Sequence, residues 1–278
     1  FLIALVVELT GAALLMTRLI PLYGPARGVW QSLFTSVSAF CNAGFDLFGG
    51  YRSLTHLQNE PVILLTLGGL IMVGGLGFPV ILECLNAHFR WRKLPLHAKL
   101  VLAVTAGLIA FGTLSILALE WDNPRTLDGG LTVWQKLYNS LFQSITFRTA
   151  GFNTIDQTAL CEGSKLLSFL LMFIGGAPAG TAGGVKITTV AMLFFSVRSL
   201  MRGREETEAF GRRFSRNALA RALCIFLLAI AFLFVGAMVM SLTERGTACG
   251  SMDFIDKMFE LASALGTVGL TVGVTEVA

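Results

Sequence analysis

Long apolar runs alternate with short polar connections along this chain. Five runs reach the length that crosses a hydrocarbon core of roughly 30 Å, and only the first of them carries charges, at Glu8 and Arg18. Backbone groups in lipid have no water to bond, so runs of this length without a period-2 alternation must be helices and not barrel strands. The pattern predicts an all-α membrane protein. The runs are Phe1 to Ile20, Pro61 to Leu82, Leu100 to Leu119, Leu166 to Val185 and Ala222 to Thr243.

A short motif recurs three times between these runs. Each copy contains a small residue, a glycine and a bulky apolar residue, and each follows an amphipathic stretch. This layout is typical of a pore loop between two helices, and its recurrence indicates a tandem duplication. We expect units at 1–85, 98–200 and 217–278. The motifs are Ser38 to Phe45, Thr146 to Phe152 and Ser263 to Leu270, and the stretches lie near Val29 to Phe40, Trp134 to Thr146 and Met252 to Leu265.

Composition and charge fit a membrane protein and give its orientation. Hydrophobic residues make up 54% of the chain and charged residues 14%, with a mean hydropathy of +0.72. The loops at 86–99 and 198–221 are rich in Arg and Lys, which places them in the cytoplasm by the positive-inside rule. The three motifs then face outward. These loops also account for the net charge of +4, so we expect no binding of nucleic acid.

The motifs have the residue types that a backbone filter requires. A dehydrated cation regains from stacked carbonyls what it loses from water, and glycines allow the unusual backbone that such stacking needs. The amphipathic stretches become pore helices whose negative ends face the ion, and the bulky residues are expected to pack behind the filter. A plainer alternative is that each glycine only forms a turn or a close helix contact. The predicted filter residues are Asn42, Ala43, Gly44, Phe45, Thr149, Ala150, Gly151, Phe152, Thr267, Val268, Gly269 and Leu270.

One apolar run cannot be a regular helix. It contains five glycines and a proline at membrane depth, and irregular backbone there is tolerated only beside a cavity or inside protein. We expect a gate below the filter, with a positive charge at Lys186; tight helix packing is the alternative. A phosphate-binding loop is excluded because Val185 separates Gly184 from Lys186. The predicted gate is Gly175, Gly176, Ala177, Pro178, Ala179, Gly180, Thr181, Ala182, Gly183, Gly184, Val185 and Lys186. In the first unit, the run at 61–82 has a similar glycine pattern but is expected to be less interrupted.

The sequence has no arrangement typical of an enzyme or a metal site. The five cysteines form no C-x-x-C pair, and the three histidines are isolated. We therefore expect no catalysis and no cofactor in this chain. Because Phe1 already lies inside an apolar run and Ala278 follows the third motif directly, we expect the fold to be incomplete at both ends, as an interior piece of a longer chain.

At the three motifs and at Gly183 to Lys186, the sequence resembles the Ktr/Trk potassium-uptake family, and within it most resembles the KtrB-type membrane subunits. The resemblance runs from Phe1 to Ala278. It implies four helix–pore–helix repeats around one potassium path, of which this chain holds the second, the third and part of the fourth. It also implies potassium as the substrate, activation by sodium, a membrane homodimer and a cytoplasmic ring of nucleotide-binding regulatory subunits of the KtrA type.

We therefore expect a pore-forming subunit for potassium uptake in the cell membrane. A secondary transporter with a broken-helix binding site is the alternative, since it explains 175–186 without a pore. It does not explain three similar loops that open to the same side. A non-transporting membrane scaffold leaves every motif unexplained.

Overall fold

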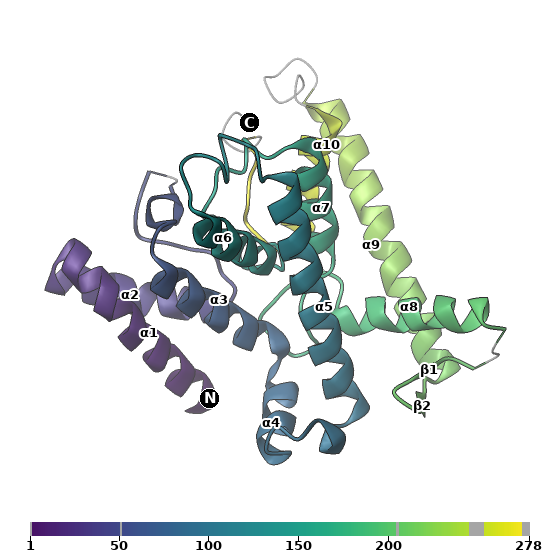
Figure 1. Cartoon of the computed structure of the whole chain (residues 1–278). Helices are drawn as coiled ribbons and strands as arrows, with labels where there is room; N and C mark the ends of the chain where they lie inside the picture. The colour runs from purple at the N-terminus through teal and green to yellow at the C-terminus, as the bar shows by residue number, and fades with distance from the viewer. Residues whose placement is uncertain (1, 51, 204–205, 245–252, 274–278) are drawn as a thin grey trace.

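The computed structural model describes residues 2–50, 52–203, 206–244 and 253–273. Nearly all of their regular secondary structure is helical (Figure 1). The helices are α1 (Leu2–Tyr23), α2 (Pro25–Phe40), α3 (Pro61–Leu76), α4 (Phe78–Asn86), α5 (Leu96–Leu119), α6 (Val133–Thr146), α7 (Glu162–Phe173), α8 (Ile187–Met201), α9 (Arg216–Thr243) and α10 (Phe254–Leu265), with 3₁₀ turns at Thr55–Leu57 and Trp91–Lys93.

Three described helices, α1, α5 and α9, are each long and apolar enough to cross a membrane. They have 22, 24 and 28 residues, and at about 1.5 Å per residue each spans a bilayer core. The surface of α9 is apolar, with Phe232, Phe234 and Met238 each more than 60% exposed, as expected for a helix that faces lipid. The spans predicted at 1–20, 100–119 and 222–243 are thus confirmed for their described residues.

Three shorter helices, α2, α6 and α10, occupy the amphipathic stretches, which confirms that these stretches are helical; Met252 lies outside the described residues. Sequence signals start the first two. Pro25 lies in the first turn of α2, and Thr132 forms a capping box with Gln135 before α6. Their buried faces are partly polar: Ser32 and Ser36 in α2 are fully buried. In Figure 1, α6 lies in the middle of the molecule, where it packs against α3 and α5.

The run at 61–82 was expected to be less interrupted than the run at 166–185, and its break is indeed shorter, a single residue between α3 and α4. The chain bends by 94° between α3 and α4. Gly77 lies at the bend with φ of +83°, a conformation that glycine tolerates. The bend is held from outside the run, since the Phe78 amide donates to the Ala179 carbonyl (3.4 Å). The first unit is therefore interrupted as well as the second.

The run at 166–185 is broken, as its glycines predicted, although it ends as a helix earlier than expected. Helix α7 stops at Phe173, and α8 begins only at Ile187. The Gly175 amide donates to the Val185 carbonyl (3.0 Å), which closes the intervening loop on itself. Figure 1 shows α8 crossing at a steep angle to α5 and α9. We call residues 174–186 the intramembrane loop.

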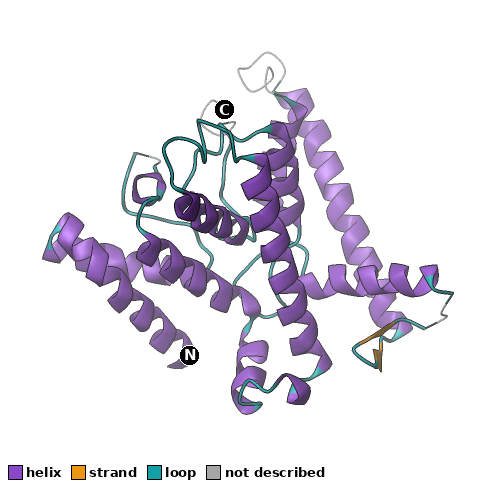
Figure 2. Cartoon of the chain, viewed as in Figure 1, coloured by secondary structure: helices purple, strands orange, loops and turns teal. Residues whose placement is uncertain are grey.

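The arginine-rich connection between α8 and α9 contains a small departure from an all-α fold. Strands β1 (Glu208–Ala209) and β2 (Arg212–Arg213) form an antiparallel hairpin, coloured orange in Figure 2. Arg213 pairs with Glu206 (2.5 Å) and Glu208 (3.2 Å). These ion pairs are exposed, so each contributes less than about 1 kcal/mol. Arg204 and Glu205 lie outside the described residues.

Candidate functional site

The three predicted filter segments share one backbone conformation. Gly44, Gly151 and Gly269 have φ of +71°, +90° and +87°. Two residues before each glycine, Asn42, Thr149 and Thr267 have φ of +51°, +74° and +54°, although non-glycine residues rarely adopt this region. Both positions were among the predicted filter residues, but the glycine motif predicted the unusual backbone only at the glycines. The positive φ at the polar residue two places earlier was not predicted.

The structure brings these segments together in chain order. A Cβ on Gly44 would lie 2.6 Å from the Ala150 carbonyl oxygen and 2.8 Å from the Cα of Gly151. A Cβ on Gly151 would overlap the Val268 carbonyl oxygen. Each of these glycines therefore faces the residue before the next glycine, as expected for segments at successive corners of a ring. Among the described residues, Gly269 has no neighbour of this kind within 4 Å.

The bulky residue after each glycine does not behave uniformly. Phe152 and Leu270 are buried and pack in the apolar core, as predicted. Phe45 is 69% exposed, so the expectation that it packs behind the filter is wrong; none of the described elements covers its side of the first segment. Hydroxyl groups at the ends of α2 and α6 hold two of the backbone carbonyls. The Ser38 hydroxyl donates to the Phe45 carbonyl (2.7 Å), and the Thr146 hydroxyl donates to the Phe152 carbonyl (2.5 Å).

A polar cavity of about 740 Å³ opens above the glycines. Two carboxylates that the sequence analysis missed, Asp46 and Asp156, line it. Carboxylates in a concave site raise the local concentration of cations. Acidic residues two and five places after a filter glycine were a usable signal. The remaining lining residues are Gly44, Gly50, Ser53, Gly151, Asn153, Gln157, Thr158, Gly269, Leu270 and Thr271.

The intramembrane loop lies directly against the filter segments. The Thr181 hydroxyl accepts a hydrogen bond from the Asn42 amide (2.8 Å) and donates one to the Phe40 carbonyl (2.9 Å). The Gly183 amide donates to the Thr149 hydroxyl (3.0 Å). The loop is therefore bonded to both the first and the second segment.

Small residues let the loop approach α3. The Ala177 amide donates to the Gly75 carbonyl (2.9 Å), and the Thr181 amide donates to the Gly74 carbonyl (3.1 Å). A Cβ on Gly180 would lie 2.9 Å from the Gly75 oxygen. The glycines of this segment thus permit close backbone contact in addition to breaking the helix.

Two basic side chains contact the same loop. Arg148, only 8% exposed, points a guanidinium nitrogen at the Gly175 carbonyl (3.4 Å), and this contact joins the second filter segment to the loop. The Lys186 ammonium donates to the Ala182 carbonyl (2.7 Å) within the loop. Removal of either side chain is therefore expected to loosen the loop.

A buried carboxylate organises the connections that follow α5 and precede α7. Glu120 accepts hydrogen bonds from the Thr126 hydroxyl (2.6 Å), the Asn123 amide (2.7 Å) and the Cys161 backbone (3.0 Å). Burial alone raises the pKa of this carboxyl, but hydrogen bonds from Ser164, Thr126 and Cys161 outweigh it and lower the pKa below the ordinary 4.5. Glu120 is thus ionised and structural at neutral pH.

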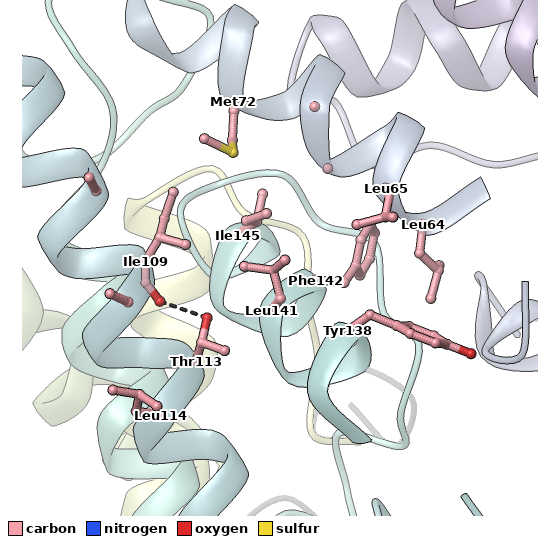
Figure 3. Close-up of a pocket in the computed structure, with 14 residues that line it drawn as sticks. Leu64, Leu65, Met72, Ile109, Thr113, Leu114, Tyr138, Leu141, Phe142 and Ile145 are labelled. Carbon is pink, nitrogen blue, oxygen red and sulfur yellow. Dashed lines mark hydrogen bonds between the residues drawn. The ribbon is translucent and has the colours of Figure 1, made fainter. Parts of the chain in front are cut away.

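A second cavity, of about 590 Å³, lies between α3, α5 and α6 (Figure 3). Its lining is apolar, with Leu64, Met72 and Phe142 among its residues. Thr113 faces it, but its hydroxyl donates to the Ile109 carbonyl of its own helix (2.7 Å). An apolar cavity cannot replace the hydration of a cation, so this one is not part of an ion path.

No group of three or more His, Cys, Asp or Glu side chains within the described ranges is placed to hold a metal ion. The cysteines that can be placed are free: Cys41 and Cys224 are exposed, whereas Cys84 is buried. Cys249 lies outside the described residues.

Comparisons with known proteins give close relatives. The potassium/sodium uptake protein NtpJ of Enterococcus hirae is 39% identical over 272 residues, which cover 98% of this chain and 59% of that protein. The Ktr system potassium uptake protein B of Bacillus subtilis is 38% identical, over 99% of this chain and 60% of that protein. The chain thus spans about three-fifths of the length of these relatives.

A solved structure shares the fold. The crystal structure of the potassium transporter TrkH from Vibrio parahaemolyticus matches with a TM-score of 0.68 at 16% identity, over 87% of this chain and 52% of that one. The family model described as TrkH, cation transport protein, matches residues 2–278. A match over almost the whole length, together with these relatives, shows that the chain belongs to the TrkH family of cation transport proteins.

Proposed function

We propose that this chain forms most of a selective potassium pore for uptake into the cell. It is an integral membrane protein of a cation-transporter family, which is not a class of enzymes. The observation that carries the proposal is the packing of Gly44 against Ala150 and of Gly151 against Val268. Carbonyls in such a ring can replace the water lost by a dehydrated cation.

The filter in this proposal consists of three segments from three units, 1–85, 98–200 and 217–278. Each segment contributes the four residues predicted from the sequence, 42–45, 149–152 and 267–270. Asp46 and Asp156 collect cations at the outer opening. Potassium is the transported substrate. The similarity to a potassium/sodium uptake protein supports a role for sodium, which we propose as an activator.

The intramembrane loop, including Gly175 to Lys186, is the gate of this pore. Its hydrogen bonds to Asn42 and Thr149 support a position directly below the filter. An unwound segment at membrane depth loses helix stability, and a gating role explains why it is retained.

The chain is expected to act within a larger assembly. A relative named as one protein of a Ktr system supports a multi-component complex. We propose a membrane homodimer that binds a cytoplasmic ring of nucleotide-binding regulatory subunits. The arginine-rich connection between α8 and α9 is the docking surface, because it continues directly from the helix that follows the gate.

Deletion of 177–183 from the full-length protein tests the proposal. Potassium flux into proteoliposomes is expected to rise, because the obstruction is removed while the filter carbonyls remain. Lys186→Ala removes one hydrogen bond inside the loop and is expected to raise flux less. If the deletion abolishes flux in a protein that still folds and inserts, the loop is not a gate and the gating proposal fails.

A secondary transporter remains the competing function, favoured by one observation. The bend of α3–α4 and the break between α7 and α8 contact each other through Phe78 and Ala179, and discontinuous helices that meet at membrane depth form the binding site in such transporters. A rise in flux after the same deletion would exclude the transporter, since the deletion would remove its binding site and abolish transport.

A further inference from the structure

Three residues with unfavourable backbone conformations stand at equivalent positions of the three filter segments. Asn42, Thr149 and Thr267 each lie two residues before the filter glycine and have φ between +51° and +74°. This region is costly for a threonine because its side chain is branched at Cβ. Such strain persists only where the surrounding structure over-determines it.

The side chain of each of these residues meets the intramembrane loop. The Asn42 amide donates to the Thr181 hydroxyl (2.8 Å), and the Thr149 hydroxyl accepts from the Gly183 amide (3.0 Å). Thr267 makes the third contact by packing, because a Cβ on Gly183 would overlap its hydroxyl oxygen. Three positions related by the repeat thus converge on residues 181–183.

The surroundings make these contacts specific. Thr149 is fully buried and Asn42 is 6% exposed, so on loss of the loop these two side chains would lose bonds that water cannot readily replace. Thr267, in contrast, is exposed. Gly74 is required for the first contact, since a Cβ there would lie 2.8 Å from the Thr181 hydroxyl oxygen and overlap the Phe40 carbonyl. Both the strained residues and the glycines around them serve the same junction.

We propose that Asn42, Thr149 and Thr267 form a polar collar that seats the intramembrane loop and couples its position to the backbone of the filter. The inference rests on the proposed gating function and specifies how gate and filter communicate. The loop cannot leave without breaking bonds to residues that set the filter backbone. A change in that backbone, such as one that accompanies the binding or loss of a cation, in turn weakens the contacts that hold the loop.

The test compares Thr149→Val and Asn42→Ala, each of which removes one hydrogen bond to the loop, in the full-length protein, with and without deletion of 177–183. Valine keeps the branching at Cβ and therefore the backbone strain, but it removes the hydroxyl. The matched control is Thr113→Val in α5, whose hydroxyl bonds only to its own helix. Potassium flux into proteoliposomes and the preference for potassium over sodium are the measurements.

We expect Thr149→Val to raise flux roughly fivefold in the protein with an intact loop, which is the factor that one hydrogen bond of ordinary net strength represents. In the deletion background this increase is expected to vanish, because the Gly183 amide that bonds to the Thr149 hydroxyl is deleted. Thr149→Ser keeps the hydroxyl and is expected to raise flux less than Thr149→Val. Asn42→Ala, which removes the amide that donates to Thr181, gives an independent second variant if Thr149→Val fails to fold.

Different failures are distinguishable. If deletion raises flux while the collar variants behave like Thr113→Val, the gate stands and the collar is wrong. If Thr149→Val changes flux or ion preference equally in both backgrounds, the residue acts on the filter alone, and the collar is also wrong. If deletion does not raise flux, the proposed gating function itself fails.

Discussion

Substitution of one filter glycine provides a direct test of the ring formed by the filter segments. Gly151 has φ of +90°, and a Cβ at this position would overlap the Val268 carbonyl oxygen. Alanine in the left-handed region costs about 1–2 kcal/mol, roughly a five- to thirtyfold change in population. The overlap adds to this cost, because its partner is backbone and cannot turn aside as a side chain can.

Gly130 supplies a matched control. It has nearly the same φ, +94°, but lies in an outer loop where a Cβ would meet no atom within 4 Å. Gly130→Ala therefore includes the backbone cost without the overlap. We expect Gly151→Ala to reduce potassium uptake by more than about thirtyfold, while Gly130→Ala leaves uptake within about twofold of wild type because it does not touch the filter.

The assay is potassium-limited growth of an uptake-deficient cell, followed by potassium and sodium flux in proteoliposomes. Gly44→Ala, whose Cβ would lie 2.6 Å from the Ala150 oxygen, is expected to act in the same direction. Uptake and ion preference at wild-type levels in Gly151→Ala would refute the argument, since the second and third segments could then not meet around the ion path.

Three further predictions concern the surfaces around the pore. Asp156→Asn is expected to raise the potassium concentration at half-maximal flux by a few fold at low ionic strength and to have little effect at high salt. Equal effects at both salt concentrations would contradict an electrostatic attraction of cations by Asp156. Arg212→Glu with Arg213→Glu is expected to weaken copurification with a cytoplasmic regulatory ring, and unchanged binding would mean that these residues only set topology. The lowered pKa of Glu120 stabilises the folded state above pH 4.5, and this stability is lost as pH falls through the folded value. Thermal unfolding of Glu120→Gln between pH 7 and pH 3 should therefore depend less on pH than that of wild type.

The sequence predicted those features that depend on local pattern. Apolar runs located α1, α5 and α9, and amphipathic stretches located α2, α6 and α10 within a few residues. The glycine motif identified three segments whose backbones prove to be equivalent. Each of these signals lies within about ten residues of the structure that it specifies, so no knowledge of the tertiary fold was needed.

The missed features depend on partners far away in the chain. The bend at Gly77 is held by Ala179, and nothing near Gly77 announces that contact. The strained conformations of Asn42 and Thr149 are compensated by residues 181 and 183, so propensity alone would have argued against them. Phe45 shows the opposite error. The repeat suggested that Phe45 would be buried as Phe152 and Leu270 are, but the neighbouring elements leave its side chain exposed.

The carbonyls of the two interrupted helices bear on whether the protein is a pore or an alternating-access transporter. A transporter of that class uses unwound carbonyls to bind its solute and ions. Here such carbonyls accept hydrogen bonds from backbone amides of the protein itself. The Gly74 carbonyl accepts from the Thr181 amide, the Gly75 carbonyl accepts from the Ala177 amide, and the Gly176 carbonyl accepts from the Ile187 amide. An interrupted segment whose polar groups are already paired has little left to offer a solute, and it is better suited to close a path than to bind a substrate. Potassium flux through a pore should then increase in proportion to the driving force once the loop is removed. A transporter would saturate at the rate of its conformational cycle with the loop in place and lose transport without it.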